Sequence, residues 1–342
     1  MRIAVNCLWY DSRRETGVER YATYLLEALD SLPHSVTVVI GPDCQVKLRG
    51  GRVVVGSVPR RPRLAREQIC LFPDTDLLIT PAYVPPLGYP GKQILVVHDL
   101  AHVAFPESVP LRARIYLRTL LAAGMRRSAA VVTDSETVLS EVSRRYPDLQ
   151  RKLHRIYPPV PPWSQSPGVV SDPLPCDLNS PYLLAVGTGR RKNVEVLVQG
   201  FELSGLTSHK LVVIGSGVSR VRSRVIFPGR VSDGALTTLY QGTAGFIFPS
   251  IYEGFGLPLL EAARFNVPIL CSDIPVFREI AGGHARYVSN FHSPSAWARA
   301  LNAFVLGSDA GSRALMDARF ARNAFVNSWD QVIREVGRGG RT

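Results

Sequence analysis

A glycine-containing loop within residues 248–262 is the segment best suited to holding an anion. It reads F-P-S-I-Y-E-G-F-G-L-P-L-L-E-A, which is a strand end, a turn and a helical stretch. We expect the helix to begin near Pro258, where the missing N–H of proline costs nothing. The helix end carries a partial positive charge, so the neighbouring backbone amides would bind a diphosphate. These amides belong to Phe255, Gly256 and Leu257.

Two glutamates, Glu253 and Glu261, flank this loop with seven residues between them. Glu253 precedes the turn, and we expect Glu261 in the first turn of the helix. Gly254 and Gly256 would let the backbone approach a ligand closely. The two carboxylates can then face one cleft, one meeting a sugar and the other a ribose. The loop alone leaves an alternative open, a surface loop in which Glu261 only complements the helix dipole.

A second glycine turn, at residues 187–193, reads G-T-G-R-R-K-N and precedes another expected helix. Arginine, through paired hydrogen bonds, and lysine, as a point charge, can neutralise a leaving diphosphate. By itself the turn also fits a solvated basic loop. In the first half of the chain, a buried strand ends in His98 and Asp99. Ligands of parallel sheets bind at such carboxyl ends, although a lone histidine is also compatible with a structural role.

These segments together resemble glycosyltransferase family 4, the group 1 family, whose members share a signature of the form P-S-x-x-E-G-F-G-L-P-x-x-E-A. The likeness continues through residues 267–275 and 279–282, covers most of the second half of the chain, and is thinner in the first half. The resemblance implies a retaining glycosyltransferase of the α/β GT-B fold. That fold has two Rossmann-like domains whose parallel sheets face a central cleft.

The resemblance also implies residue roles. The catalytic residues would be His98, Glu253, Arg191 and Lys192. The donor-binding residues would be Gly17, Val231, Gly254, Phe255, Gly256, Leu257 and Glu261. In this family the first glutamate lies by the hydroxyls of the donor sugar, and the second binds the ribose. Arg191 and Lys192 would hold the donor pyrophosphate, although the short turn leaves the choice between Arg190 and Arg191 open.

Three further positions follow from the resemblance. His98 would face the donor sugar and the acceptor, the backbone of Val231 would read the nucleobase, and the loop of Gly17 would lie over the donor phosphates. Glu15 and Thr16 depart from the family pattern, which has a further glycine there. Asn266 stands where the family often has glycine, a mild departure because asparagine tolerates a left-handed helix end.

Alternating apolar runs and amphipathic stretches predict parallel sheets covered by helices. In the first half, we expect strands at 2–8, 36–40, 52–57, 76–80, 93–97 and 129–133, and helices at 17–30, 110–127 and 135–145. In the second half, we expect strands at 182–187, 210–215, 224–227, 244–248 and 267–271, and helices at 192–203, 232–241 and 257–265. The predicted domains are 1–160 on the acceptor side and 182–324 for the nucleotide sugar. A proline-rich linker at 161–181 joins them, and a closing helix at 325–342 returns to the first domain.

The composition of this 342-residue chain, 46% hydrophobic and 20% charged, is that of an ordinary globular protein. Five scattered cysteines without a C-x-x-C pair, and a start that lacks a secretory signal, predict a cytoplasmic protein. The net charge of +12 fits an anionic partner. Specific nucleic-acid binding is disfavoured because the basic pairs are dispersed and no RNA-binding or zinc-finger motif accompanies them.

The helix expected at 110–127 mixes arginines with leucines and isoleucine, as in helices that lie on anionic lipid. A peripheral position at the inner face of a membrane is therefore one expectation. A packed helix with solvated arginines is the other.

The expected reaction moves a hexose from a nucleotide-diphosphate sugar, with GDP-mannose as the best guess. The acceptor would be a glycan or a lipid-linked molecule in bacterial surface polysaccharide synthesis. No cofactor is expected, and no metal, because no Asp-x-Asp motif stands where a metal would be held. A non-catalytic nucleotide-sugar-binding protein and another GT-B enzyme, such as a sugar epimerase, are the alternatives. A nicotinamide enzyme is disfavoured because the first turn has only Gly17.

Overall fold

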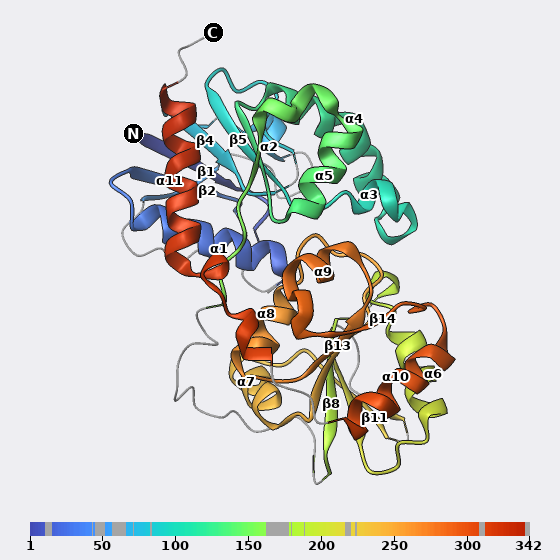
Figure 1. The fold of residues 1–342 in the computed structure, drawn as a ribbon. Coiled ribbons are helices and arrows are strands. Elements are labelled where there is room, and N and C mark those ends of the chain that lie inside the picture. Colours follow the sequence, from blue (N-terminus) through green and yellow to red (C-terminus); the bar gives the residue numbers. More distant parts are fainter. Residues whose placement is uncertain are drawn as a thin grey trace. The chain divides into compact units, whose positions relative to one another are not determined.

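The protein was analysed as a computed structural model. It describes residues 1–10, 16–42, 44, 52–56, 66–70, 72–82, 84–161, 178, 180–187, 189–215, 220–222, 224–307 and 312–338. The chain forms two compact units (Figure 1). The first unit is Met1–Pro159 with Arg319–Thr342, and the second is Val160–Ala318. The linker expected at 161–181 lies almost entirely outside the described residues, as does Glu15.

The first unit is built on a seven-stranded sheet in the order β3-β2-β1-β4-β5-β6-β7. Its strands are β1 (Arg2–Cys7), β2 (Ser35–Ile40), β3 (Arg52–Val55), β4 (Leu77–Thr80), β5 (Lys92–Val97), β6 (Ala130–Thr133) and β7 (Leu153–Arg155). Every pairing is parallel. The central strands are buried throughout, which explains their continuous apolar sequence. The strand order reverses between β1 and β4, which makes that place the switch point of the sheet.

Six α-helices of the described residues belong to this unit: α1 (Gly17–Asp30), α2 (Arg66–Ile69), α3 (Ala101–Ala104), α4 (Leu111–Arg127), α5 (Glu136–Arg145) and α11 (Arg322–Arg338). The closing helix α11 buries Phe325 and Trp329, and the ring of Phe325 lies edge-on to Tyr21 of α1. Lys92 Nζ donates to the carbonyl oxygens of Val336 and Gly337, at 2.8 and 3.1 Å. A lysine at the last carbonyls complements the negative helix end, so α11 is fixed to the start of β5.

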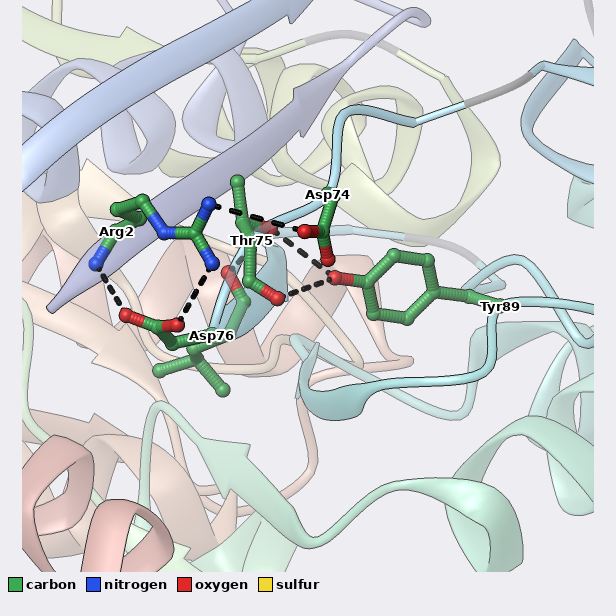
Figure 2. A network of polar contacts seen from close by, with 6 residues as sticks. Arg2, Asp74, Thr75, Asp76 and Tyr89 are labelled. Carbon is green, nitrogen blue, oxygen red and sulfur yellow. Dashed lines mark hydrogen bonds and ion pairs between the residues drawn. The ribbon is translucent and has the colours of Figure 1, made fainter.

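A polar network connects the amino-terminal ends of two central strands of the same sheet, β1 and β4 (Figure 2). The carboxylate of Asp76 accepts from the backbone N of Arg2 at 2.7 Å and from its guanidinium at 3.2 Å. These contacts lower the pKa of Asp76, the backbone hydrogen bond contributing most. The hydroxyl of Tyr89 donates to Thr75 O at 3.2 Å. The network joins the beginnings of β1 and β4, the end of the sheet opposite to the one where ligands bind.

The second unit has another seven-stranded sheet, in the order β10-β11-β9-β8-β12-β13-β14. Its strands are β8 (Tyr182–Val186), β9 (Lys210–Ile214), β10 (Arg220–Arg222), β11 (Val225–Gly229), β12 (Gly245–Phe248), β13 (Ile269–Ser272) and β14 (Arg286–Val288). All pairings are parallel except that of the edge strand β10 with β11. The two predicted parallel-sheet domains are therefore confirmed. The switch point of this sheet lies between β8 and β12.

Five α-helices of the described residues accompany this sheet: α6 (Val194–Ser204), α7 (Asp233–Gly242), α8 (Leu257–Arg264), α9 (Pro275–Ala281) and α10 (Pro294–Leu306). Helices α6 and α10 pack closely, because Gly200 has no side chain to separate them. A Cβ there would lie 2.5 Å from the Cβ of Trp297. In the described part of the chain, every helix is too short or too polar to cross a bilayer.

Candidate functional site

Two loops leave the second sheet at its switch point, and they carry most of the predicted site residues. One follows β8 and contains the turn Arg190–Lys192, a single turn of 3-10 helix. The other follows β12 and leads into α8. The two strands are hydrogen-bonded neighbours in the sheet. Ile251 N donates to Arg191 O at 2.9 Å and so joins the loops directly.

Lys192 and Glu253 meet between these loops. Lys192 Nζ donates to Glu253 Oε1 in an ion pair, in which the lysine side chain is 29% exposed and the glutamate 15%. The stem of the lysine packs on Gly187, whose φ is +111°, and a Cβ at Gly187 would lie 2.9 Å from Lys192 Cδ. The ammonium group lies 5.3 Å from the ring centroid of Phe248. The position of the lysine is thus fixed by a glycine, an aromatic ring and a carboxylate.

Glu261 has a different partner. It lies in the second turn of α8, not in the first as we expected, because four residues of the helix, beginning with Leu257, precede it. Its side chain is buried, with 4% of the residue exposed. Tyr240 of α7 donates its hydroxyl to Glu261 Oε2 at 3.0 Å. The two glutamates of the signature are therefore bound to different groups, one to a lysine and one to a tyrosine.

The backbone before α8 has the conformation expected of a loop that lets a ligand come close to its amides. Gly256 is the residue before the helix, and its φ of +109° is one that residues with side chains rarely adopt. A Cβ there would also come within 3.1 Å of Phe277 Cε1. Phe255 is buried and Leu257 opens the helix. Gly254 lies in the loop directly after Glu253.

Val231 lies between β11 and α7, the helix that carries Tyr240. Ser232, the next residue, accepts from Ala235 N at 3.1 Å and thereby sets the start of that helix. Arg190 is exposed, and Arg191 is half-buried. The confirmed left-handed conformation of Asn266, with a φ of 57°, ends α8 as its sequence suggested.

In the first unit, His98 follows β5 and uses both ring nitrogens. Nδ1 lies 2.6 Å from Asp134 Oδ2, and Nε2 lies 2.7 Å from Pro81 O. Burial disfavours the charged imidazole, but the charge and hydrogen bond of Asp134, with the Pro81 carbonyl, outweigh it and raise the pKa of His98. Two acceptors at the two nitrogens are satisfied together only by the doubly protonated ring.

Gly17 opens α1 in the same unit. A Cβ at this position would meet nothing within 4 Å, so the fold itself does not require glycine there. Four residues along the helix, the ring of Tyr21 lies edge-on to His98 with centroids 4.8 Å apart. Helix α1 therefore connects the Gly17 turn to the histidine.

Two family models match the chain. The family model described as "Glycosyl transferases group 1" matches residues 171–324, and the one described as "Glycosyltransferase Family 4" matches residues 16–163. The chain belongs to this glycosyltransferase family.

Two relatives of this glycosyltransferase are O-antigen enzymes. The O-antigen chain mannosyltransferase RfbU of Salmonella typhimurium (strain LT2) is 29% identical over 262 residues, covering 73% of this chain and 70% of the relative. The O-antigen chain mannosyltransferase B of Escherichia coli is 27% identical over 270 residues, covering 72% and 69%.

Solved structures share the fold. Sucrose-phosphate synthase from Thermosynechococcus elongatus has a TM-score of 0.70 at 18% identity, covering 99% of this chain and 100% of its own. Anabaena HepE in complex with UDP and glucose has a TM-score of 0.71 at 12% identity, covering 98% and 100%. At these identities the likeness shows the fold, which is GT-B.

Two of the side chains that the sequence reasoning missed in this glycosyltransferase, Asp134 and Tyr240, form hydrogen bonds with predicted site residues. Asp134 stands at the carboxyl end of β6, next to the strand that ends at His98, so its position carried a signal. The same argument that singled out His98 applies to it. Tyr240 lies inside an amphipathic helix, where a buried tyrosine is ordinary, and only the fold shows what its hydroxyl contacts.

One Asp-x-Asp triplet occurs in the sequence, at Asp74, Thr75 and Asp76. It belongs to the network at the amino-terminal edge of the first sheet (Figure 2). Both carboxylates face Arg2, whose guanidinium lies 3.8 Å from Asp74 Oδ2 and 3.2 Å from Asp76 Oδ1. The triplet is paired with a guanidinium and lies at the amino-terminal ends of the strands, whereas ligands of such sheets bind at the carboxyl ends. Its contacts with Arg2 join the beginnings of β1 and β4.

Proposed function

We propose that this glycosyltransferase moves mannose from GDP-mannose to a glycan or lipid-linked acceptor in the synthesis of a bacterial surface polysaccharide. The O-antigen mannosyltransferases among its relatives support the sugar and the pathway. The guanine base rests on that kinship, because mannose is the sugar of both enzymes.

The meeting of Lys192 and Glu253 at the switch point is the observation that carries the proposal. A nucleotide-diphosphate sugar needs a cation for its phosphates and an acceptor for its sugar hydroxyls, one beside the other. The ion pair supplies both. The backbone at Gly256 and the start of α8 add amides and the positive helix end to the same loop.

We propose a reaction of the retaining type, which the family resemblance implies. The bond between C1 of the sugar and the diphosphate oxygen breaks, and a bond from the acceptor oxygen to C1 forms on the same face. Configuration is thereby retained, and the acceptor proton passes to the departing phosphate. Lys192 and Arg191 stabilise the negative charge that develops on the diphosphate, so no metal is needed. Glu253 accepts from the sugar hydroxyls, and Glu261 binds the ribose.

The contacts of His98 limit the roles that its side chain can have in the reaction. A histidine held by Asp134 and Pro81 is a hydrogen-bond donor on both sides, and its pKa is raised. A ring that donates from both nitrogens has no lone pair available to act as a base, so His98 would act through its charge.

We also propose that helix α4 contacts a membrane surface. Its second half is packed through Leu121, Gly124 and Met125. In its first half, Leu111 and Ile115 are 59% and 55% exposed, one helical turn apart. Exposed arginines accompany them, at Arg112 and Arg118. Two bulky apolar side chains among guanidinium groups fit an anionic lipid surface, where a lipid-linked acceptor would be found.

The first experiment is a calorimetric screen of GDP, UDP and ADP on the wild-type chain and on Glu261→Ala and Lys192→Ala. We expect GDP to bind and both variants to weaken it at least about tenfold. Transfer of mannose from GDP-mannose then separates an enzyme from a non-catalytic sugar-nucleotide-binding protein. The same assay with EDTA tests whether transfer needs a divalent metal ion. Binding that ignores both substitutions would refute the site, and product formed by epimerisation would favour the alternative enzyme class.

Binding to vesicles tests the membrane partner separately. We expect the wild-type chain to bind phosphatidylglycerol vesicles at low salt, and Leu111→Ser with Ile115→Ser to weaken that binding without changing GDP affinity. Equal behaviour on neutral and anionic vesicles would argue against a role for the arginines of α4.

A further inference from the structure

Asn193 is the residue that joins the basic turn Arg190–Lys192 to helix α6. Its backbone is left-handed, with a φ of 52° and a ψ of 26°, a conformation that asparagine adopts more readily than most residues with a side chain. Its backbone N donates to Arg190 O at 3.1 Å and closes the turn, and its carbonyl oxygen accepts from Leu197 N at 3.2 Å. The direction in which the turn leaves the helix is therefore set at Asn193, next to Lys192.

The side chain of Asn193 is bound to a distant part of the second unit. Its Nδ2 donates to Phe291 O at 2.8 Å, across 98 positions of the sequence. The same carbonyl oxygen accepts from Trp297 Nε1 at 2.9 Å. A carbonyl oxygen has two lone pairs, so the two hydrogen bonds are compatible. Phe291 O is thus shared between the basic turn and helix α10.

Helix α10 holds this carbonyl in place. Trp297 is fully buried, and the side chain of Ser293 caps the helix two residues after Phe291. Helices α10 and α6 pack closely at Gly200, beside the Cβ of Trp297. The carbonyl is therefore a fixed point, and the amide of Asn193 connects the basic turn to it.

We propose that Asn193 is a positioning residue that holds Lys192 in place for the donor diphosphate. The inference rests on the proposed function, in which Lys192 binds that diphosphate. Contacts with Gly187 and Glu253 direct the side chain of Lys192, and the turn determines where this side chain starts. Loss of the Asn193 amide would remove one of the contacts that fix the turn, and the ammonium group would meet the phosphate less accurately.

The test compares GDP with GMP by calorimetry. Lys192 lies beside Glu253, the residue proposed to meet the sugar, so it would bind the phosphate that carries the sugar, which GMP lacks. Asn193→Gly removes the amide and still permits a left-handed backbone. We expect it to weaken GDP binding roughly 5- to 10-fold and GMP binding less than about 2-fold. In a Lys192→Ala background, Asn193→Gly should change GDP affinity less than about 2-fold.

Asn302→Ala is the matched control. Asn302 Nδ2 donates to Ser204 O at 3.0 Å, so it also connects α10 to α6, but at the carboxyl end of α6. The two variants lose the same kind of hydrogen bond, and only Asn193 adjoins Lys192. We expect the control to keep the ratio between GDP and GMP affinities.

Hydrogen exchange without nucleotide gives a second readout. The backbone amide of Lys192 donates to Gly189 O at 3.0 Å within the turn. We expect this amide to exchange at least about fivefold faster in Asn193→Gly and at an unchanged rate in Asn302→Ala.

Three outcomes would overturn the inference. If the wild-type chain prefers GDP to GMP and Asn193→Gly keeps that preference, or leaves the exchange of the Lys192 amide unchanged, Asn193 has no positioning role and the proposed function stands. If the wild-type chain binds neither nucleotide, or both equally, the proposed role of Lys192 is wrong and the inference falls with it. An equal change of the affinity ratio in Asn302→Ala would show a general effect of loosening α6.

Discussion

Glu253→Gln should tighten the binding of a nucleoside diphosphate while it slows sugar transfer. Glu253 is paired with Lys192, the residue that we expect to hold the diphosphate. A diphosphate has to take the ammonium group from the carboxylate and then remain beside its negative charge. Glutamine keeps the shape and can still hydrogen-bond, but it removes the competition and the repulsion. The same change deprives the donor sugar of a charged acceptor.

The size of the gain follows from the burial of the pair. The two side chains are 29% and 15% exposed, so neither bulk water nor a dry interior describes their surroundings. A carboxylate about 7 Å from a unit charge repels it by roughly 2.4 kcal/mol at an effective dielectric constant of about 20, and by about 0.6 kcal/mol in water. We therefore expect a gain of about 1 to 2 kcal/mol, or roughly 5- to 30-fold in Kd for GDP.

Isothermal titration at two salt concentrations measures this gain. Glu195→Gln is the matched control, because it removes the same charge from an exposed position. Glu195 lies in the first turn of α6, the helix that follows Lys192. The control should change Kd less than about 2-fold in 0.15 M salt, where exposed charges are screened. Weaker GDP binding in Glu253→Gln, or an equal gain in both variants, would refute the competition between the carboxylate and the diphosphate.

Three further substitutions test single contacts. Gly187→Ala places a Cβ on a φ of +111° and 2.9 Å from Lys192 Cδ, so it should cost about 1 to 3 kcal/mol in urea unfolding and weaken GDP binding in calorimetry. Asp134→Asn should cost about 3 kcal/mol at pH 6 and less at pH 9. The raised pKa of His98 stabilises the fold below its ordinary pKa near 6.5, and this stabilisation is lost as pH rises through the raised value. Gly17→Ala should leave the melting temperature unchanged, because a Cβ there meets nothing, yet slow transfer if this turn lies over the donor phosphates.

Much of the fold could be predicted because long periodic segments carry their own signal. Helix α1 has the bounds expected from its apolar spacing, and the buried strands of both sheets are continuous apolar runs. Short elements at the sheet edges were missed. Strands β7 and β14 have three residues each, too few to show a period. Helix α10 was also missed, although Ser293 caps its start and Trp297 lies on its buried face.

The partners of the site residues could not be predicted in the same way. Lys192 and Glu253 are 61 residues apart, and His98 and Asp134 are 36 apart. Such contacts depend on which strands become neighbours and on how far a loop turns after its strand. Local spacing contains neither quantity. The family resemblance identified the residues, and only the fold shows which protein groups each of them contacts.

The ion pair of Lys192 and Glu253 balances two charges at the switch point of the second sheet. A partly buried ammonium group without a counter-ion is costly, and so is a buried carboxylate. Lys192 and Glu253 neutralise each other in the structure. In the proposed reaction, a diphosphate that binds Lys192 frees Glu253 to accept from the sugar hydroxyls, so each charge exchanges one partner for another. On this proposal, the first step of donor binding also prepares the carboxylate for the sugar, and this coupling would account for the presence of both residues on two neighbouring loops at one switch point.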